Sequence, residues 1–326
     1  MSIIDIYGRK INYLRLSVTD RCNLRCSYCM PAQGIRKHAH ADMLSYEQLY
    51  RIAKSSVAIG VEKIRITGGE PLVRNGILGF LSDLKQIPGL KKLVLTTNGV
   101  FLGDMAEDLR SAGVESINIS LDSMRPEVFF SITRGGDLSK VLAGIKAAEQ
   151  TGFKHLKINM VVMRGVNDDE ILDFAALTIN KPFNVRFIEY MPTLKEKNWQ
   201  SLMVPGDELL KRLSERYRMQ KVTHEALDGP AVNYQIQGAV GKLGFITPIS
   251  SHFCQDCNRI RVTSSGAVKS CLFDDGKMSL KPFLENDDDV GLREALRQVA
   301  NMKPHRHTLM TGEADNHLYN MSQIGG

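Results

Sequence analysis

Three cysteines with the spacing C-x3-C-x2-C directly follow a strand-like segment near the start of the chain. Spacings this short let one loop place the sulfurs of Cys22, Cys26 and Cys29 around a single inorganic centre. An iron–sulfur cubane normally takes four thiolate ligands, whereas this run supplies three. One iron would then stay open to a small molecule, as a catalytic zinc ion keeps one position for its substrate. The run therefore predicts chemistry at the metal and not a closed structural cage.

Zinc is an alternative centre for this run, with His38 or His40 as its fourth ligand, and three unrelated buried thiols are another alternative. The other three cysteines of the chain form a second triplet with the spacing C-x2-C-x13-C: Cys254, Cys257 and Cys271. By spacing alone, a second three-thiol cluster and a zinc ribbon with His252 as fourth ligand fit this triplet about equally well. The presence of the first triplet favours the cluster.

Two arginines, Arg259 and Arg261, follow Cys257 at alternate positions. On a strand, alternate side chains point to the same face, so both guanidinium groups would face one ligand. Guanidinium groups bind phosphate and carbonyl oxygens through paired hydrogen bonds. The net charge of +6 agrees with an anionic ligand. That charge is too small to indicate nucleic-acid binding by itself.

Short β-rich runs alternate with amphipathic helices from residue 14 to about residue 215. The expected strands are Leu14–Thr19, Lys63–Thr67, Lys92–Thr97, Ser116–Leu121, Leu156–Val162 and Val185–Tyr190. The first expected helix is Ser45–Ile59, in which Ser45 and Gln48 form a capping-box pattern. The other expected helices are 77–87, 104–112, 139–151, 168–179 and 207–217. Repeated strand–helix units predict a parallel sheet with right-handed crossovers.

The expected fold class is α/β, as a partial (βα)6 barrel, because six units are too few for a closed eight-fold barrel. A doubly wound flat sheet is the second choice. Polar motifs follow the expected strands at their carboxyl ends, where parallel α/β folds build their sites. These positions are the cysteine loop, Gly68–Pro71, Thr97–Gly99, Ser120–Asp122, Asn159 and Glu189–Pro192.

The alternation ends near residue 218, which divides the chain into an expected barrel domain, 1–217, and a C-terminal region, 218–326. Strand-like runs at Tyr234–Gln237 and Leu243–Thr247, and a helix over Val290–Met302, are expected in the C-terminal region. We expect this region to pack on the barrel and to cover its open side.

The composition is that of a soluble globular protein, with 43% hydrophobic and 24% charged residues. No apolar run approaches the ~20 residues that span a bilayer. The segment Met1–Lys10 lacks the apolar core of a signal peptide. We therefore expect a cytoplasmic protein without membrane contact, in which the six cysteines do not form disulfides.

The first triplet has an aromatic residue, Tyr28, just before its last cysteine and resembles the signature of the radical S-adenosylmethionine (SAM) enzymes. In that superfamily the open iron binds the amino and carboxylate groups of SAM. The two triplets and the end of the chain, Gly325-Gly326, together resemble one family within it, the GTP 3′,8-cyclases of molybdenum cofactor biosynthesis. The resemblance extends from Leu14 to Gly326. It implies conversion of GTP to 3′,8-cyclo-7,8-dihydro-GTP through a 5′-deoxyadenosyl radical, the first step of molybdopterin synthesis.

The resemblance also implies roles for individual residues. The first triplet would hold a [4Fe-4S] cluster that binds SAM, and the second triplet an auxiliary [4Fe-4S] cluster whose open iron binds guanine. The implied SAM-binding residues are Tyr28, Gly68, Gly69, Glu70, Ser120 and Met191. The implied GTP-binding residues are Arg15, Lys63, Arg65, Thr96, Lys157, Arg186, Arg259 and Arg261, with the basic residues expected as a ring at the strand ends. The implied catalytic residues are Arg15, Arg259, Arg261, Gly325 and Gly326, of which the two glycines would thread into the barrel interior.

Partners implied by the family are an external one-electron reductant and a second copy of the chain in a homodimer, while docking of the next pathway enzyme is left open. One alternative function is a radical SAM enzyme that modifies RNA or a peptide. Aromatic residues make up only 7% of the chain, without the basic-aromatic cluster that RNA binding needs. A non-enzymatic electron carrier or zinc module is the other alternative, but neither needs the Gly68–Pro71 loop. The run His305–His307 is expected to be a solvated loop, with contact to the substrate as the alternative.

Overall fold

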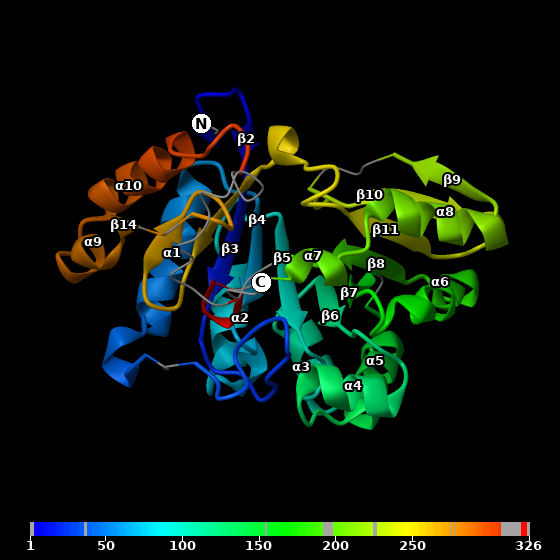
Figure 1. The fold of residues 1–326 in the computed structure, drawn as a ribbon. Helices are drawn as coiled ribbons and strands as arrows, with labels where there is room; N and C mark the ends of the chain where they lie inside the picture. The colour runs from blue at the N-terminus through cyan, green and yellow to red at the C-terminus, as the bar shows by residue number, and fades with distance from the viewer. Residues whose placement is uncertain are drawn as a thin grey trace.

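The computed structural model describes residues 3–35, 38–153, 155–191, 198–223, 227–274, 276, 278–307 and 321–324. In these residues a twelve-stranded sheet runs through the molecule, with helices packed against it (Figure 1). A separate two-stranded hairpin, β1 (Ile3–Ile4) and β2 (Lys10–Ile11), lies beside the helix α10 (Asp289–Asn301). None of the described helices is long and apolar enough to cross a membrane.

Six consecutive parallel strands form the centre of the described sheet: β3 (Tyr13–Ser17), β4 (Lys63–Thr67), β5 (Lys92–Thr97), β6 (Ser116–Ser120), β7 (Leu156–Val162) and β8 (Asn184–Glu189). Their order in space follows their order in the chain. A doubly wound sheet would reverse that order at a switch point. The sheet therefore has the strand order of the predicted partial barrel, and each strand lies within two residues of its predicted range.

The connections contain the predicted helices: α1 (Tyr46–Ala58), α2 (Ile77–Lys85), α3 (Leu102–Ser111), α5 (Leu138–Gln150), α6 (Ile171–Asn180) and, after the last strand, α8 (Gly206–Arg216). The predicted capping box is confirmed, because the Ser45 and Gln48 side chains each accept a hydrogen bond from the other's backbone N–H. A further helix, α4 (Pro126–Thr133), is not among the predicted elements. It ends at Arg134, whose φ of 54° is left-handed.

The C-terminal region extends the sheet at both edges. The strand β11 (Lys242–Ile246) pairs in parallel with β8, and β12 (Arg259–Val262) pairs in parallel with β3. Antiparallel strands continue outward from these two: β10 (Val232–Ile236) and β9 (Met219–Val222) on one side, β13 (Ala267–Lys269) and β14 (Met278–Ser279) on the other. The C-terminal region thus packs on the barrel as predicted. It does so by adding strands to both edges of the barrel sheet, so one sheet contains strands from both parts of the chain.

The remaining described helices are short except for α10, which lies within one residue of its predicted range. They are α7 (Trp199–Leu202), α9 (Lys281–Glu285) and α11 (Met321–Ile324). The last of these is drawn in red beside the C mark in Figure 1, in the middle of the molecule and far from the N mark at its edge. The end of the described chain therefore lies close to the centre of the fold.

Apolar and polar side chains alternate along the central strands. In β4, Ile64 and Ile66 belong to the hydrophobic core, whereas Lys63, Arg65 and Thr67 are buried polar residues. Parallel strands that are covered by helices on both faces carry nearly continuous apolar runs. The alternation here means that one face of the sheet packs against helices while the other face encloses polar groups.

Candidate active site

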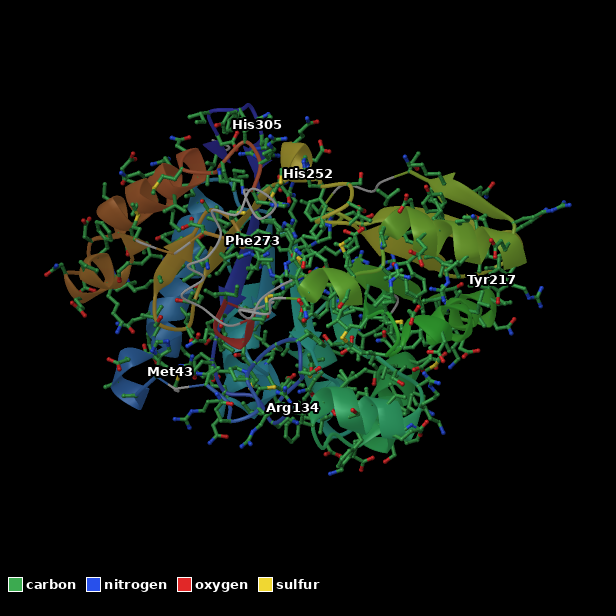
Figure 2. The ribbon with its side chains drawn as sticks, in the orientation of Figure 1. Met43, Arg134, Tyr217, His252, Phe273 and His305 are labelled. Atoms are coloured by element: carbon green, nitrogen blue, oxygen red, sulfur yellow. The ribbon has the colours of Figure 1, made fainter. Side chains whose placement is uncertain are left out.

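One cavity on the polar face of the sheet is lined by all six cysteines of the chain: Cys22, Cys26, Cys29, Cys254, Cys257 and Cys271. All six thiols are free. His252 and Phe273, labelled in Figure 2, line the cavity from the C-terminal region. The ring of His307 contacts both of their rings and lines the same cavity, so the expectation of a solvated loop at 305–307 is wrong for this residue. The fold thus brings thiol triplets from opposite ends of the sequence into one space.

The loop with the first triplet follows β3 and is held by the end of α4. The Arg25 N–H donates to the Thr133 carbonyl at 3.1 Å. The Arg134 side chain, labelled in Figure 2, donates from Nη1 to the carbonyls of Arg25 and Met30 at 3.1 and 2.9 Å. Because these contacts lie on both sides of Cys26 and Cys29, the chain's own hydrogen bonds set the positions of the thiols.

The glycine pair after β4 is required by a close approach of two backbone segments. A Cβ atom added to Gly68 would lie 2.6 Å from the Thr19 carbonyl oxygen, and one added to Gly69 would collide with the Arg21 carbonyl. The Gly69 N–H donates to the Thr19 carbonyl at 2.8 Å. The pair therefore packs against the segment that leads into the cysteine loop, and this contact alone excludes a side chain.

Glu70 fastens the same motif to the end of β5. It is 1% exposed, and its carboxylate accepts hydrogen bonds from Thr97 Oγ1 at 2.8 Å and from the Asn98 N–H at 2.7 Å. Burial raises the pKa of Glu70 to about 7, and these hydrogen bonds limit the rise. Glu70 does not line the cavity, whereas the other predicted SAM-binding residues do: Tyr28, Gly68, Gly69, Ser120 and Met191.

Tyr28 is oriented by Asp122, a side chain that the sequence analysis did not select although it lies in a selected motif. The Tyr28 hydroxyl donates to Asp122 Oδ2 at 2.8 Å, and the Val161 N–H donates to Oδ1 at 2.9 Å. Burial raises the pKa of Asp122 to about 6, against the effect of these two hydrogen bonds. The motif after β6 therefore lies at the cavity, as its position at a strand end predicts.

The second triplet is surrounded by cations. Cys257 Sγ accepts hydrogen bonds from Lys303 Nζ at 3.5 Å and from Arg259 Nη2 at 3.9 Å. Burial acts to raise the pKa of the Cys257 thiol, but Arg259 and Lys303 outweigh it and lower the pKa to about 6. The thiolate is the form that binds metal. In the described part of the chain, no group of three His, Cys, Asp or Glu side chains is placed to hold a single metal ion.

Three arginines stand side by side on neighbouring strands. Arg261, Arg15 and Arg65 are paired in register across β12, β3 and β4, and all three are buried and line the cavity. Arg259 lines it too, which confirms that the alternating pair faces one space. The pKa of Arg15 lies well below its ordinary value, mainly because the group is buried and then because of the charges of Arg261 and Arg65. Guanidinium groups stay charged in proteins, so this row concentrates positive charge that an anion would neutralise.

Lys63 and Lys157 lie at the beginning of β4 and β7, where the segment 227–230 covers them. Lys63 Nζ donates to the Leu227 carbonyl at 2.6 Å, and Lys157 Nζ lies 3.7 Å from a carboxylate oxygen of Asp228. Burial is the largest cause that lowers the pKa of each lysine to about 6. The expected position at strand ends thus holds for Lys63 and Lys157, at amino ends. It is wrong for Arg15 and Arg65, which lie in the middle of β3 and β4. These residues lie along the strands, because side-chain alternation and not strand termination directs them inward.

Several buried polar atoms that face the cavity have no hydrogen-bond partner among the described residues: Tyr13 Oη, Arg65 Nε, Thr96 Oγ1, Asn159 Oδ1 and Arg186 Nη2. Buried polar groups in proteins nearly always form hydrogen bonds, so these atoms are candidates to bind a ligand or water. Guanidinium donors and hydroxyls suit phosphate and ribose oxygens. Tyr13 is missing from the predicted site, although it lies two residues before Arg15 on the same strand, a signal that would have found it. Asn159 is among the polar positions predicted at the carboxyl ends of the strands, but without an assigned ligand.

Gly325 and Gly326 lie outside the described residues, so their role stays a prediction. The helix α11, which directly precedes them, lies at the cavity. Its Ser322 is 2% exposed and lines the cavity, and the Ser322 backbone makes a hydrogen bond to the Cys29 thiol. The chain just before the glycine pair is therefore packed beside the first triplet.

Comparison with known proteins gives the same assignment along the whole chain. Residues 16–178 match the radical SAM superfamily, and residues 183–309 match the family Molybdenum Cofactor Synthesis C. A GTP 3′,8-cyclase of Geobacter sulfurreducens is 60% identical over the full length of both chains. Another, of Peptoclostridium acidaminophilum, is 46% identical over 99% of this chain and 98% of that one. Streptococcus suis SuiB bound to S-adenosylmethionine, at 15% identity, shares the fold with a TM-score of 0.61 over 89% of this chain and 69% of its own. The chain belongs to the GTP 3′,8-cyclase family of the radical SAM superfamily.

Proposed function

We propose that the protein is a radical SAM GTP 3′,8-cyclase, which converts GTP to 3′,8-cyclo-7,8-dihydro-GTP in the first step of molybdenum cofactor biosynthesis. The observation that carries the proposal is the shared cavity, in which two thiol triplets and a row of buried arginines face one space. The family relationship over the full chain supports the same activity.

Each triplet would hold one [4Fe-4S] cluster through three thiolates and leave one iron open. When bound, the first cluster and SAM supply a 5′-deoxyadenosyl radical, and the second cluster supplies an iron for the guanine base. The thiols fit this purpose because all six are free and face the cavity. The residues proposed to hold SAM are Tyr28, Gly68, Gly69, Glu70, Ser120 and Met191.

The chain's own side chains bind and orient GTP. Lys63, Lys157 and Arg186 are buried basic residues near Asp228, and the phosphate oxygens of a triphosphate would stabilise their charged forms. Arg15, Arg65, Arg259 and Arg261 and the free Thr96 hydroxyl would fix the nucleotide between the two triplets. The surrounding walls keep water from a reactive carbon centre. Gly325 and Gly326 would complete the enclosure.

The test is an anaerobic assay with reconstituted protein, GTP, SAM and dithionite, followed by mass spectrometry of the nucleotides. We expect 5′-deoxyadenosine and a cyclised nucleotide in equal amounts, and roughly eight irons per chain. Formation of 5′-deoxyadenosine only with RNA or a peptide would refute the GTP assignment. Zinc in place of iron, without SAM cleavage, would indicate the non-enzymatic alternative.

A matched pair of variants tests the arginine row. Arg261→Met removes a buried guanidinium group that would contact the nucleotide, so we expect cyclisation to fall by about a hundredfold or more. Arg297→Met makes the same change on α10, where the side chain is 44% exposed, and should leave cyclisation unchanged. Equal activity of both variants would refute the assignment of this row to GTP.

We also propose a cytoplasmic location, because a reducing compartment keeps thiols free for metal. An external one-electron reductant is needed to start the reaction. The homodimer and the division into a barrel domain, 1–217, and a C-terminal region, 218–326, are further proposals. Light scattering of the anaerobic protein at micromolar concentration would test the dimer, for which we expect twice the chain mass.

A further inference from the structure

Lys303 is a buried lysine that follows α10 and has no part in the SAM and GTP sites proposed above. It is 3% exposed. Its Nζ atom donates to the carbonyls of Ser270 and Arg259, at 2.7 and 2.8 Å, and to the Cys257 sulfur at 3.5 Å. An ammonium group has three N–H donors and no acceptor, so these contacts occupy all of its donors. The side chain therefore has a fixed position.

The two carbonyls belong to the two arms of one hairpin. The hydrogen-bonded ladder between β12 and β13 ends before it reaches Arg259 on one arm or Ser270 on the other. Cys257 lies two residues before Arg259, and Cys271 directly follows Ser270. The ammonium group thus joins the arms at the point where the ladder stops and the thiols begin. Without it, no described backbone hydrogen bond would span the arms at this point.

The backbone next to Lys303 is itself held by Arg9, in the hairpin of β1 and β2 beside α10 (Figure 1). Arg9 donates from Nη2 to the Pro304 carbonyl at 3.0 Å and from Nη1 to the Cys254 carbonyl at 2.8 Å. Its Nε atom pairs with the Asp5 carboxylate at 2.5 Å. Arg9 therefore contacts the backbone of Cys254, and Lys303 contacts Cys257 and the residue before Cys271.

We propose that Lys303 is a positioning residue of the auxiliary cluster, which fixes the separation of Cys257 and Cys271 and donates a hydrogen bond to the Cys257 thiolate. The inference rests on the proposed function, which assigns a cluster to these thiols. When such a cluster gains one electron, its negative charge grows by one, and a nearby cation stabilises that form. Hydrogen bonds to the sulfurs also set cluster potentials. Lys303 accordingly retains the cluster and raises its reduction potential.

The test uses two variants of the full-length protein, reconstituted without air. Lys303→Met keeps the length of the side chain and removes its charge, whereas Lys303→Arg keeps the charge. Iron and sulfide are counted, and both clusters are followed by EPR during a redox titration. We expect Lys303→Met either to fall from roughly eight irons to roughly four, or to keep them with a more negative second midpoint potential. The first cluster should keep its spectral response to SAM.

Lys303→Arg should lie between Lys303→Met and the unaltered protein in both measurements. The matched control is Lys91→Met, which makes the same change at a side chain that is 62% exposed and should alter neither iron content nor potential. A Lys303→Met protein with full iron content and an unchanged second potential would overturn the proposed role.

If Lys303→Met does not fold, Lys303→Gln takes its place, since it keeps a hydrogen-bond donor without the charge. A second potential equal to that of the unaltered protein would then overturn the role. An unaltered protein that binds only about four irons would refute the auxiliary cluster, and with it both the proposed function and this inference. A failure confined to the variants would leave the proposed function intact.

Discussion

Binding of GTP at Lys63 and Lys157 is expected to take up protons from solvent. In the protein without nucleotide, burial lowers the pKa of both lysines to about 6, and the next cause is Arg65 for Lys63 and Arg186 for Lys157. At pH 7.5 each lysine is then roughly 3% protonated. Phosphate oxygens favour the ammonium form and raise its pKa. The bound state therefore holds more protons than the free state, so the affinity for GTP falls as the pH rises above 6.

The size of the effect follows from the number of lysines that become charged. Each one should take up about one proton at pH 7.5 and raise the dissociation constant of GTP about tenfold per pH unit. Lys63 lowers the pKa of Lys157, and Asp228 raises the pKa of both lysines. The protons therefore belong to the pair, and the combined slope should lie between about tenfold and about a hundredfold per pH unit.

The measurement is calorimetric titration of the anaerobic protein with GTP at pH 7.5, in two buffers with different ionisation enthalpies. Dissociation constants are then compared at pH 7.5, 8.0 and 8.5. Lys63→Met should remove about one proton from the uptake. The exposed Lys91→Met should remove none. Equal binding heats in both buffers, together with a dissociation constant independent of pH, would refute the lowered lysine pKa values.

Three further changes test other parts of the fold. Gly69→Ala should lower the iron content by loss of the first cluster, because the new Cβ collides with the Arg21 carbonyl. Gly79→Ala places its Cβ in open space and should keep full iron content. Gly325→Ala with Gly326→Ala should lower the rate of cyclisation while both clusters remain; unchanged turnover would contradict the threaded tail. Ser45→Ala should lower the free energy of unfolding by about 1 kcal/mol in denaturant titrations, because α1 loses its capping box. Iron content should not respond to Ser45→Ala.

The central strands and their helices could be predicted because their signals are local. The limits of β4 and β6 follow from β-rich runs between glycine-terminated helices, and Gly60 and Gly113, which precede these strands, take the left-handed φ values of 111° and 87° that such helix ends require. The sequence does not reveal helix α4, because it begins at Pro126, shortly after the motif Ser120–Asp122, and its apolar face is short.

Contacts between distant parts of the chain could not be predicted in the same way. Asp228 precedes Gly229 and Pro230, as in an ordinary turn, and nothing in that local sequence indicates its ion pair with Lys157. Lys303 follows the end of a helix, where a lysine is normally solvated, and its burial depends on the ends of two other strands. The cysteines were predictable because their spacing is local, whereas the cations around them are not.

The outer pairing of β3 with β12 affects how the chain is made. The edge of β3 emerges early from the ribosome, but its partner at Arg259–Val262 is translated late. Until then, a row of backbone N–H and C=O groups is available to any neighbouring chain, which is the usual start of edge-to-edge aggregation. We therefore expect a nascent or truncated chain that ends near residue 217 to depend on chaperones, and the last hundred residues to act as the chain's own protection against self-association.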